Sequence, residues 1–410
     1  MGWLGNAAHA RWLENETDEL LAFAAGSVTH EGFGYLDAEG GLVLGEGAHL
    51  WITCRMIHSF SLGTLLGRPG SASMVDHGVA ALAGPLHDDE HGGWYAQVGP
   101  DGVIDDRKMA YAHAFVILAA SSATAAGRPG ARELLDQALA VSERHFWDED
   151  AGMVREVWDA AFTTTEDYRG VNANMHTVEA YLAAADVTDD EVWLQRATRI
   201  ATRVVTEFAP AYEWRIPEHF DTGWQPVLDY NDHQPADPFR PAGATVGHWF
   251  EWARLALHVA AALTARGAQV PDGLVSGARA LFAAGIEQGW AVDAEDGFIY
   301  TVTFDGEPLV RERMHWVVTE AVAAAAALWR YSPSEGYDGW YQLWWEYASQ
   351  YLVDTELGSW IHELSPANEP SSTVWHGKPD VYHAVQATLI PRLPLAPTMA
   401  TALARGLLDS

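Results

Sequence analysis

Two kinds of helical stretch alternate along this chain. In the first kind, apolar residues gather on one face and charged residues on the other, which is typical of a helix with one face in water. These amphipathic stretches are residues 10–25, 73–83, 131–145, 191–208, 273–288 and 339–352. The second kind is apolar almost all round after its first turn, which indicates burial on every side. It comprises residues 115–120, 178–185, 255–263 and 321–328. The pattern predicts an inner layer of buried helices covered by an outer layer.

A recurring turn divides the chain into similar units. It combines an acidic residue, a glycine and an aromatic residue, as in Asp88–Trp94 and Asp293–Phe298. It returns about six times at intervals of roughly 60 to 70 residues, which indicates a repeat architecture. Because a ring of repeats grows by adding neighbours, we expect one domain over residues 1–410. The predicted fold is all-α, an (α/α)6 toroid of inner and outer helices, with short β-hairpins at residues 94–103 and 298–308.

Charge and cysteine content narrow the class of protein. Lys and Arg number 24 against 56 Asp and Glu, and the formal net charge of -32 repels phosphate backbones and anionic lipids. Nucleic acid and membranes are therefore not expected as partners. The single Cys54 cannot form an intrachain disulfide, and the first ten residues have no apolar core of signal-peptide length. We expect a cytoplasmic protein that is a monomer or a weak homo-oligomer.

The first turns of the apolar helices carry the candidate site residues. Three pairs of residues lie three or four positions apart, so the members of each pair share a helix face and can reach one cavity. The pairs are Asn172 with His176, His248 with Glu251, and Trp316 with Glu320. Gly247 and Pro379 are helix-start signals, which places His248 and His383 in first turns, near the rim of the predicted ring.

Each of these residues also has an ordinary structural explanation. A lone histidine on an apolar helix is usually a hydrogen-bonded core residue, but core packing does not require polar openings in successive units. Glu251 and Glu320 lie on apolar helices, where burying an unpaired carboxylate costs on the order of several kcal/mol. A neighbouring histidine or a sugar hydroxyl must therefore bind each carboxylate. Arg55 fits either a salt bridge to one of these glutamates or the stabilisation of a developing charge. The indoles of Trp51 and Trp375 fit packing or stacking on a sugar ring.

Five motifs carry a resemblance to a known family. They stand in order along the chain and are Trp51–Arg55, Asn172–His176, Gly247–Trp252, Met314–Glu320 and Lys378–His383. Together they resemble the N-acylglucosamine 2-epimerase superfamily, and within it the aldose–ketose isomerase branch that includes mannose and sulfoquinovose isomerases.

The resemblance implies an (α/α)6 barrel that uses no metal or other cofactor and binds a monosaccharide. It also implies that His248 and His383 are the acid/base catalysts. Around the sugar it implies Arg55, Tyr111, Asn172, His176, Glu251, Trp316 and Glu320.

The chemistry of such an isomerase suits these residue types. Converting an aldose such as D-mannose, or D-lyxose, to its ketose requires ring opening, removal of the C2 proton and delivery of a proton to C1 through an enediol. An imidazole with a pKa near 6.5 can accept and return that proton. We expect His383 to carry the proton from C2 to C1 and His248 to open the ring, although the residues alone also permit the reverse. Arg55 would stabilise the enediolate oxygens.

Two glutamates complete the expected site. Glu251 is expected to orient His248, and Glu320 to hold sugar hydroxyls. A sugar 2-epimerase would use the same two histidines, and an inverting glycosidase could use Glu251 and Glu320. A metal-dependent isomerase could use His248 with Glu251 and His176 with Glu179, but the sequence shows no tight cluster of recognised spacing. A non-catalytic sugar-binding module is a further alternative, and it would not require two histidines at the rim.

Overall fold

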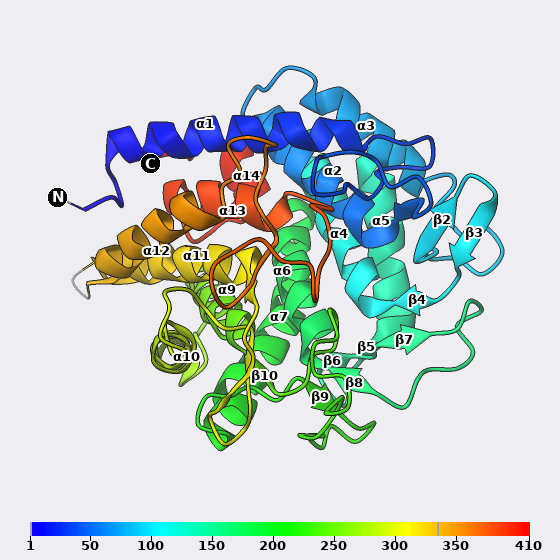
Figure 1. Cartoon of the computed structure of the whole chain (residues 1–410). Coiled ribbons are helices and arrows are strands. Elements are labelled where there is room, and N and C mark those ends of the chain that lie inside the picture. The colour runs from blue at the N-terminus through cyan, green and yellow to red at the C-terminus, as the bar shows by residue number, and fades with distance from the viewer. Residues whose placement is uncertain (1, 334–335) are drawn as a thin grey trace.

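The computed structural model describes residues 2–333 and 336–410 and shows two concentric layers of helices (Figure 1). The outer layer consists of the amphipathic helices. They are α1 (Ala7–Ala24), α3 (Ser71–Leu82), α5 (Ala131–Val141), α7 (Glu191–Arg203), α10 (Leu274–Gly289) and α12 (Tyr337–Tyr351). The inner layer consists of helices that are buried almost all round. They are α2 (Leu50–Leu65), α4 (Ala110–Ala125), α6 (Val171–Thr188), α9 (Val246–Ala265), α11 (His315–Tyr331) and α13 (Tyr382–Leu389). The predicted (α/α)6 fold is confirmed.

Contacts between successive inner helices close the ring. Each inner helix packs on the next, and α13 packs back on α2 as well as on α1. Buried alanines such as Ala324 and Ala325 of α11 leave room for close helix packing. The short helix α14 (Met399–Ala404) contacts α2, α4 and α6 and lies across one end of the ring.

Two outer helices, α5 and α7, end in π turns. The stretch predicted at 131–145 is α5 followed by a π turn, η2 (Ser142–Phe146). The stretch predicted at 191–208 is α7 followed by η3 (Val204–Phe208) and the single turn α8 (Ala209–Ala211). The described residues also contain the 3-10 turns η1 (Ala25–Ser27) and η5 (Ile390–Arg392).

Short antiparallel strands form a rim at the other end of the ring. Five strands each end where an inner helix begins. They are β1 (Ala48–His49), β4 (Lys108–Met109), β8 (Arg169–Gly170), β10 (Ala244–Thr245) and β13 (Arg313–Met314). Their partners come from the following loops. These are β2 (Gln97–Gly99), β7 (Val157–Trp158), β9 (His219–Phe220), β11 (Thr301–Val302) and β14 (Glu363–Leu364). This pairing holds the N-terminal ends of the inner helices at one mouth.

Both predicted hairpins are present. β2 pairs with β3 (Gly102–Asp105), and β11 pairs with β12 (Pro308–Val310). A further hairpin, β5 (Trp147–Asp148) with β6 (Met153–Val154), follows α5. No helix among the described residues is both long and apolar enough to span a membrane.

Candidate active site

A cavity of about 660 Å³, including its opening to solvent, lies where the inner helices begin. Every predicted site residue except Glu320 lines it. All of these residues come from inner helices, and they are Arg55, Tyr111, Asn172, His176, His248, Glu251, Trp316 and His383. Loop residues complete the wall, among them Phe239, Tyr300, Trp375 and Asp380. The ring therefore brings polar first turns from six helices to one place.

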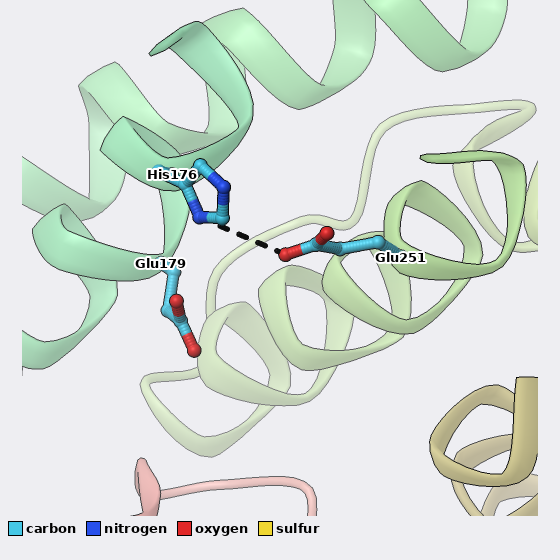
Figure 2. A group of neighbouring side chains, drawn as sticks. All are labelled: His176, Glu179 and Glu251. Atoms are coloured by element: carbon cyan, nitrogen blue, oxygen red, sulfur yellow. Dashed lines mark ion pairs between the residues drawn. The ribbon is translucent and has the colours of Figure 1, made fainter. Parts of the chain in front are cut away.

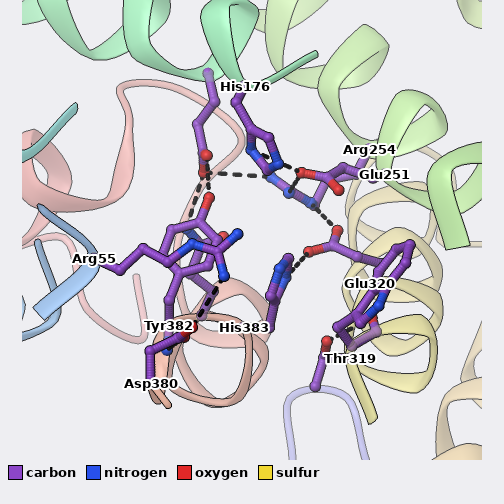
Figure 3. Close-up of polar contacts among 12 residues, drawn as sticks. Arg55, His176, Glu251, Arg254, Thr319, Glu320, Asp380, Tyr382 and His383 are labelled. Carbon is purple, nitrogen blue, oxygen red and sulfur yellow. Dashed lines mark hydrogen bonds and ion pairs between the residues drawn. The ribbon is translucent and has the colours of Figure 1, made fainter. Parts of the chain in front are cut away.

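His383 is the second residue of α13, as its helix-start signal predicted. Its Nδ1 atom lies 3.1 Å from Oε1 of Glu320 (Figure 3). Because an ionised carboxylate only accepts hydrogen bonds, Nδ1 carries the proton and Nε2 keeps a free lone pair. Burial, and then the charge of Arg55, lower the pKa of His383 well below its usual value. The imidazole is therefore neutral at pH 7 and is available as a base.

His248 is the third residue of α9, also in a first turn. Its Nδ1 atom lies 2.9 Å from Oε1 of Glu218, a buried residue in the segment that leads into β9. The expectation that Glu251 orients His248 is wrong, because Glu218 holds this position and the side chain of Glu251 points to Arg254 and His176 instead. The partner comes from another repeat, where it can approach the ring nitrogen from the side.

The indole of Trp316 packs against both histidines. Its ring centroid lies 5.2 Å from that of His248 and 5.8 Å from that of His383. Gly247 permits this position, because a Cβ atom there would stand 2.3 Å from Cζ3 of Trp316. Any larger residue at position 247 would displace the indole.

Arg55 pairs with an aspartate rather than with a glutamate. Its Nη1 atom donates to Oδ2 of Asp380 at 3.0 Å and its Nη2 atom to the hydroxyl of Tyr111 at 2.9 Å. The guanidinium also lies 4.5 Å from the ring centroid of Phe115. Burial opposes the charge, but Tyr111 and Asp380 outweigh it and raise the pKa of Arg55. Its Nε atom is buried and has no hydrogen-bond partner among the described residues.

A cluster of one histidine and two glutamates lies against the inner wall (Figure 2). Ligand atoms of His176, Glu179 and Glu251 all lie within 4.8 Å of one another, a spacing that could hold a cation. The sequence analysis found no such cluster, because Glu179 and Glu251 come from different helices. Arg254 places its own charge there, with Nη2 3.3 Å from Oε1 of Glu251. A second cation at this place would be repelled by the guanidinium.

The same cluster is short of hydrogen bonds. Nδ1 of His176 lies 3.8 Å from Oε1 of Glu251, and neither this nitrogen nor Oε2 of Glu251 has a hydrogen-bond partner in residues 2–333 and 336–410. Burial, and then the charge of Glu320, raise the pKa of Glu251 well above its usual value. Burial also lowers the pKa of His176. Both groups thus favour their neutral forms.

Glu320 lies behind His383 rather than in the cavity wall. It is 1 % exposed, and its two oxygens accept hydrogen bonds from His383 and from Nε of Arg254, the latter at 2.8 Å. These contacts favour an orienting role over the expected contact with sugar hydroxyls.

Sequence reasoning missed two charged residues of the site. Arg254 follows Glu251 by three positions on an apolar helix, and the spacing rule that selected Glu251 also applied to it. Glu218 lies in an irregular segment, where no periodic pattern could have identified it.

Aromatic side chains from two loops form the outer wall of the cavity. The ring centroid of Phe239, in the 221–243 segment, lies 6.1 Å from that of Trp51 and 5.1 Å from that of Trp375. Trp375 lies in the irregular 365–381 segment that leads into α13. The wall offers flat apolar faces beside the polar floor, as carbohydrate sites require.

Comparisons with known proteins agree with this geometry. Residues 32–387 match the family model of N-acylglucosamine 2-epimerase. The D-mannose isomerase of Thermobifida fusca is 53 % identical over 98 % of this chain and 98 % of that protein. The D-mannose isomerase of Pseudomonas cannabina pv. alisalensis is 49 % identical over 98 % of this chain and 97 % of its own length. A crystal structure of a D-mannose isomerase superposes with a TM-score of 0.86 at 27 % identity, covering 93 % of this chain and 97 % of that chain.

Proposed function

The chain belongs to the N-acylglucosamine 2-epimerase family, and we propose that it is an aldose–ketose isomerase that interconverts D-mannose and D-fructose. One observation carries the proposal. Two histidines, His248 and His383, line the same cavity and pack against Trp316, and a glutamate holds Nδ1 of each ring. That arrangement leaves two Nε2 lone pairs beside one sugar, as ring opening followed by proton transfer requires.

His383 carries the proton between the two carbons. Its neutral ring removes the weakly acidic C2 proton through Nε2 and becomes an imidazolium, which the carboxylate of Glu320 stabilises across 3.1 Å. The electron pair from the C2–H bond forms the C1–C2 double bond of the enediolate, O1 gains a proton as the hydroxyl at O2 loses one, and the imidazolium then returns its proton to C1. A base with a lowered pKa starts this step in its reactive form at neutral pH.

His248 opens the pyranose ring. Its Nε2 atom takes the proton of the C1 hydroxyl, and the resulting imidazolium, stabilised by Glu218, gives that proton to O5 as the C1–O5 bond breaks. The resulting open-chain aldehyde exposes C2 to His383. Aldose and ketose differ only in which of C1 and C2 bears the carbonyl, so His248 serves both directions.

Arg55 stabilises the negative oxygens of the enediolate. Its Nη atoms are held by Asp380 and Tyr111, which fixes the guanidinium plane before substrate arrives. A preorganised donor in a buried cavity contributes about 3 kcal/mol or more to a charged transition state. No metal, and no other cofactor, takes part in this scheme. On the sequence grounds given above, the proposed location is the cytoplasm and the proposed state a monomer or weak homo-oligomer.

Product analysis in deuterated water tests the function. D-mannose should give D-fructose as the first product, with solvent deuterium entering the transferred position. Some label from C2-deuterated mannose should reach C1 of the ketose, because one imidazole carries the proton along one face. Glucose as the dominant early product would instead show a 2-epimerase, and a sugar that binds without C2 exchange would show a glycosidase or a binding module.

A further inference from the structure

Arg254 lies beneath the sugar cavity without touching it. Its side chain is 3 % exposed, it comes from the third turn of α9, and it lines a second, smaller cavity on the far side of the charged layer, towards α14. Three glutamates of the inner ring surround it, Glu179, Glu251 and Glu320. No step of the mechanism above uses this cation.

A continuous chain of hydrogen bonds links Arg254 to the proposed base. Nε of Arg254 donates to Oε2 of Glu320 at 2.8 Å, and the other oxygen of the same carboxylate accepts from Nδ1 of His383 at 3.1 Å (Figure 3). The guanidinium and the imidazole thus approach one carboxylate from opposite sides. Among the described residues, no other side chain donates a hydrogen bond to the carboxylate oxygens of Glu320.

The position of the proton on His383 depends on the charge of Glu320. As a carboxylate, Glu320 can only accept, so Nδ1 of His383 must donate and Nε2 is left unprotonated. A carboxyl group at 1 % exposure that lost its cation would favour the protonated form, because burial penalises charge. A protonated Glu320 could donate to Nδ1 instead, and the proton of the neutral imidazole would then sit on Nε2, where it blocks the base.

We infer that Arg254 is a positioning residue that keeps Glu320 an acceptor and thereby fixes the tautomer of His383 in which Nε2 faces the sugar as the base. The inference rests on the proposed role of His383. Arg254 acts through Glu320 and touches neither the sugar nor the reacting atoms. The positive charge beside the carboxylate of Glu320 is therefore the guanidinium of Arg254.

A purely structural role for Arg254 makes different predictions. If the side chain only fixed α9 against α11, its loss would lower stability and reduce the amount of folded enzyme. The turnover of each folded molecule would then keep its pH dependence. A tautomer role predicts instead a loss of kcat with a changed pH profile, because the protonation of Glu320 then decides whether Nε2 is free.

Kinetics of matched variants separate the two roles. Arg254→Met should lower kcat at pH 7 by about 10²-fold or more, the range that loss of a general base gives, while KM for mannose changes by only a few-fold. Part of the loss should return as pH rises and Glu320 ionises. Arg254→Lys keeps a cation and a donor and should stay within about 10-fold of the parent kcat.

Arg196→Met is the matched control. Arg196 is also buried, but it lies on the outer helix α7, pairs with Glu143 at 2.9 Å and is not part of the cavity lining. Its loss should cost stability without moving the pH profile. Arg254→Met with a parental kcat and pH profile would overturn the inference, and so would an Arg254→Lys variant as inactive as Arg254→Met.

A spectroscopic measurement covers the case in which Arg254→Met does not fold. The ¹⁵N signals of His383, assigned by comparison with His383→Asn, report which ring nitrogen carries the proton in the sugar-free protein. The parent protein and Arg254→Lys should show Nδ1 protonated and Nε2 bare. A proton on Nε2 in the parent would overturn the inference. A parent that makes no ketose would remove the proposed function but would leave this tautomer result standing.

Discussion

The two histidines at the mouth share a local arrangement and differ in what stands behind it. Each lies in the first turn of an inner helix, packs against Trp316 and points Nδ1 at a glutamate. Behind His248, the glutamate is Glu218, which comes from an irregular segment. Behind His383, it is Glu320, which comes from the second turn of α11 and is also bonded to Arg254.

The difference corresponds to the two tasks. Proton transfer between adjacent carbons needs a base with a fixed tautomer at a fixed distance, and residues on packed helices supply that rigidity. Ring opening moves protons between oxygens, where water can assist and the geometry is less demanding. The histidine held by the more rigid group of residues, His383, is therefore the one assigned to proton transfer between carbons. Variants of the two histidines and of their glutamates test this assignment.

The largest expected effect follows from removing either ring. His383→Ala and His248→Ala should each lower kcat by about 10²- to 10⁴-fold or more in a folded protein. The variants should differ in isotope exchange. His248→Ala still has the carbon base and should exchange the C2 proton slowly in deuterated water through the small amount of open-chain sugar, whereas His383→Ala should not.

Circular dichroism spectra that match the parent serve as the control for folding. The reverse exchange pattern would swap the two assignments. Turnover close to that of the parent in either variant would remove that histidine from the mechanism.

The next effect comes from neutralising the two carboxylates. Glu320→Gln and Glu218→Gln keep an oxygen that can accept from Nδ1 but lose the charge that stabilises the imidazolium. We expect Glu320→Gln to lower kcat by about 10- to 100-fold with little change in KM, since Glu320 lies behind His383 and outside the cavity wall. Glu218→Gln should reduce turnover less, because ring opening has partial help from water.

Substrates that are already open-chain distinguish the Glu218→Gln variant from the Glu320→Gln variant. A reducing sugar locked in the open form by loss of its ring hydroxyl should bypass Glu218→Gln and His248→Ala but not Glu320→Gln. A Glu320→Gln variant with a raised KM and an unchanged kcat would instead support the original expectation that Glu320 binds sugar hydroxyls.

A smaller effect is expected from pH. Burial and the nearby Arg55 lower the pKa of His383, so the neutral, reactive ring persists as pH falls through 6.5, the usual value for histidine. Activity that depends on this base should be full above its lowered pKa and should be lost only as pH falls through that value. Exchange of the C2 proton by the His248→Ala variant reports the protonation of His383 without that of His248. Its rate should be almost unchanged between about pH 7.5 and 6.5. A loss of exchange centred on the usual histidine pKa would show that the base is a solvated imidazole.

The helical layers could be predicted from the sequence, and the contacts across the ring could not. Periodicity distinguished the buried α11 from the amphipathic α10, and helix-start signals placed His248 and His383 in first turns. Spacing along a helix identifies residues that share a face, which explains why Glu251 was identified and also why it was given the wrong partner.

Pairs that join different repeats have no such signal. Arg55 and Asp380 lie 325 positions apart and meet only because the ring closes α13 on α2. His248 and Glu218 are separated by 30 positions and a long loop. In both cases the partner is decided by closure of the toroid, a property of the whole chain rather than of any local pattern.

The smallest expected effect is that of a chelator. Exhaustive treatment with EDTA should leave turnover within roughly 2-fold of the untreated enzyme, because two imidazoles suffice for the enediol chemistry. The cluster of His176, Glu179 and Glu251 is the place where this expectation could fail, since its spacing suits a cation. Arg254 lies against Glu251 and Glu320, and its charge competes with any divalent ion there. Arg254→Met removes that competitor and should bind Co²⁺ or Mn²⁺ more tightly than the parent in calorimetry. If the activity of the parent enzyme disappears with EDTA and returns with a divalent ion, the reaction depends on a metal. In that case the cation that the glutamate cluster requires is the metal ion and not the guanidinium of Arg254.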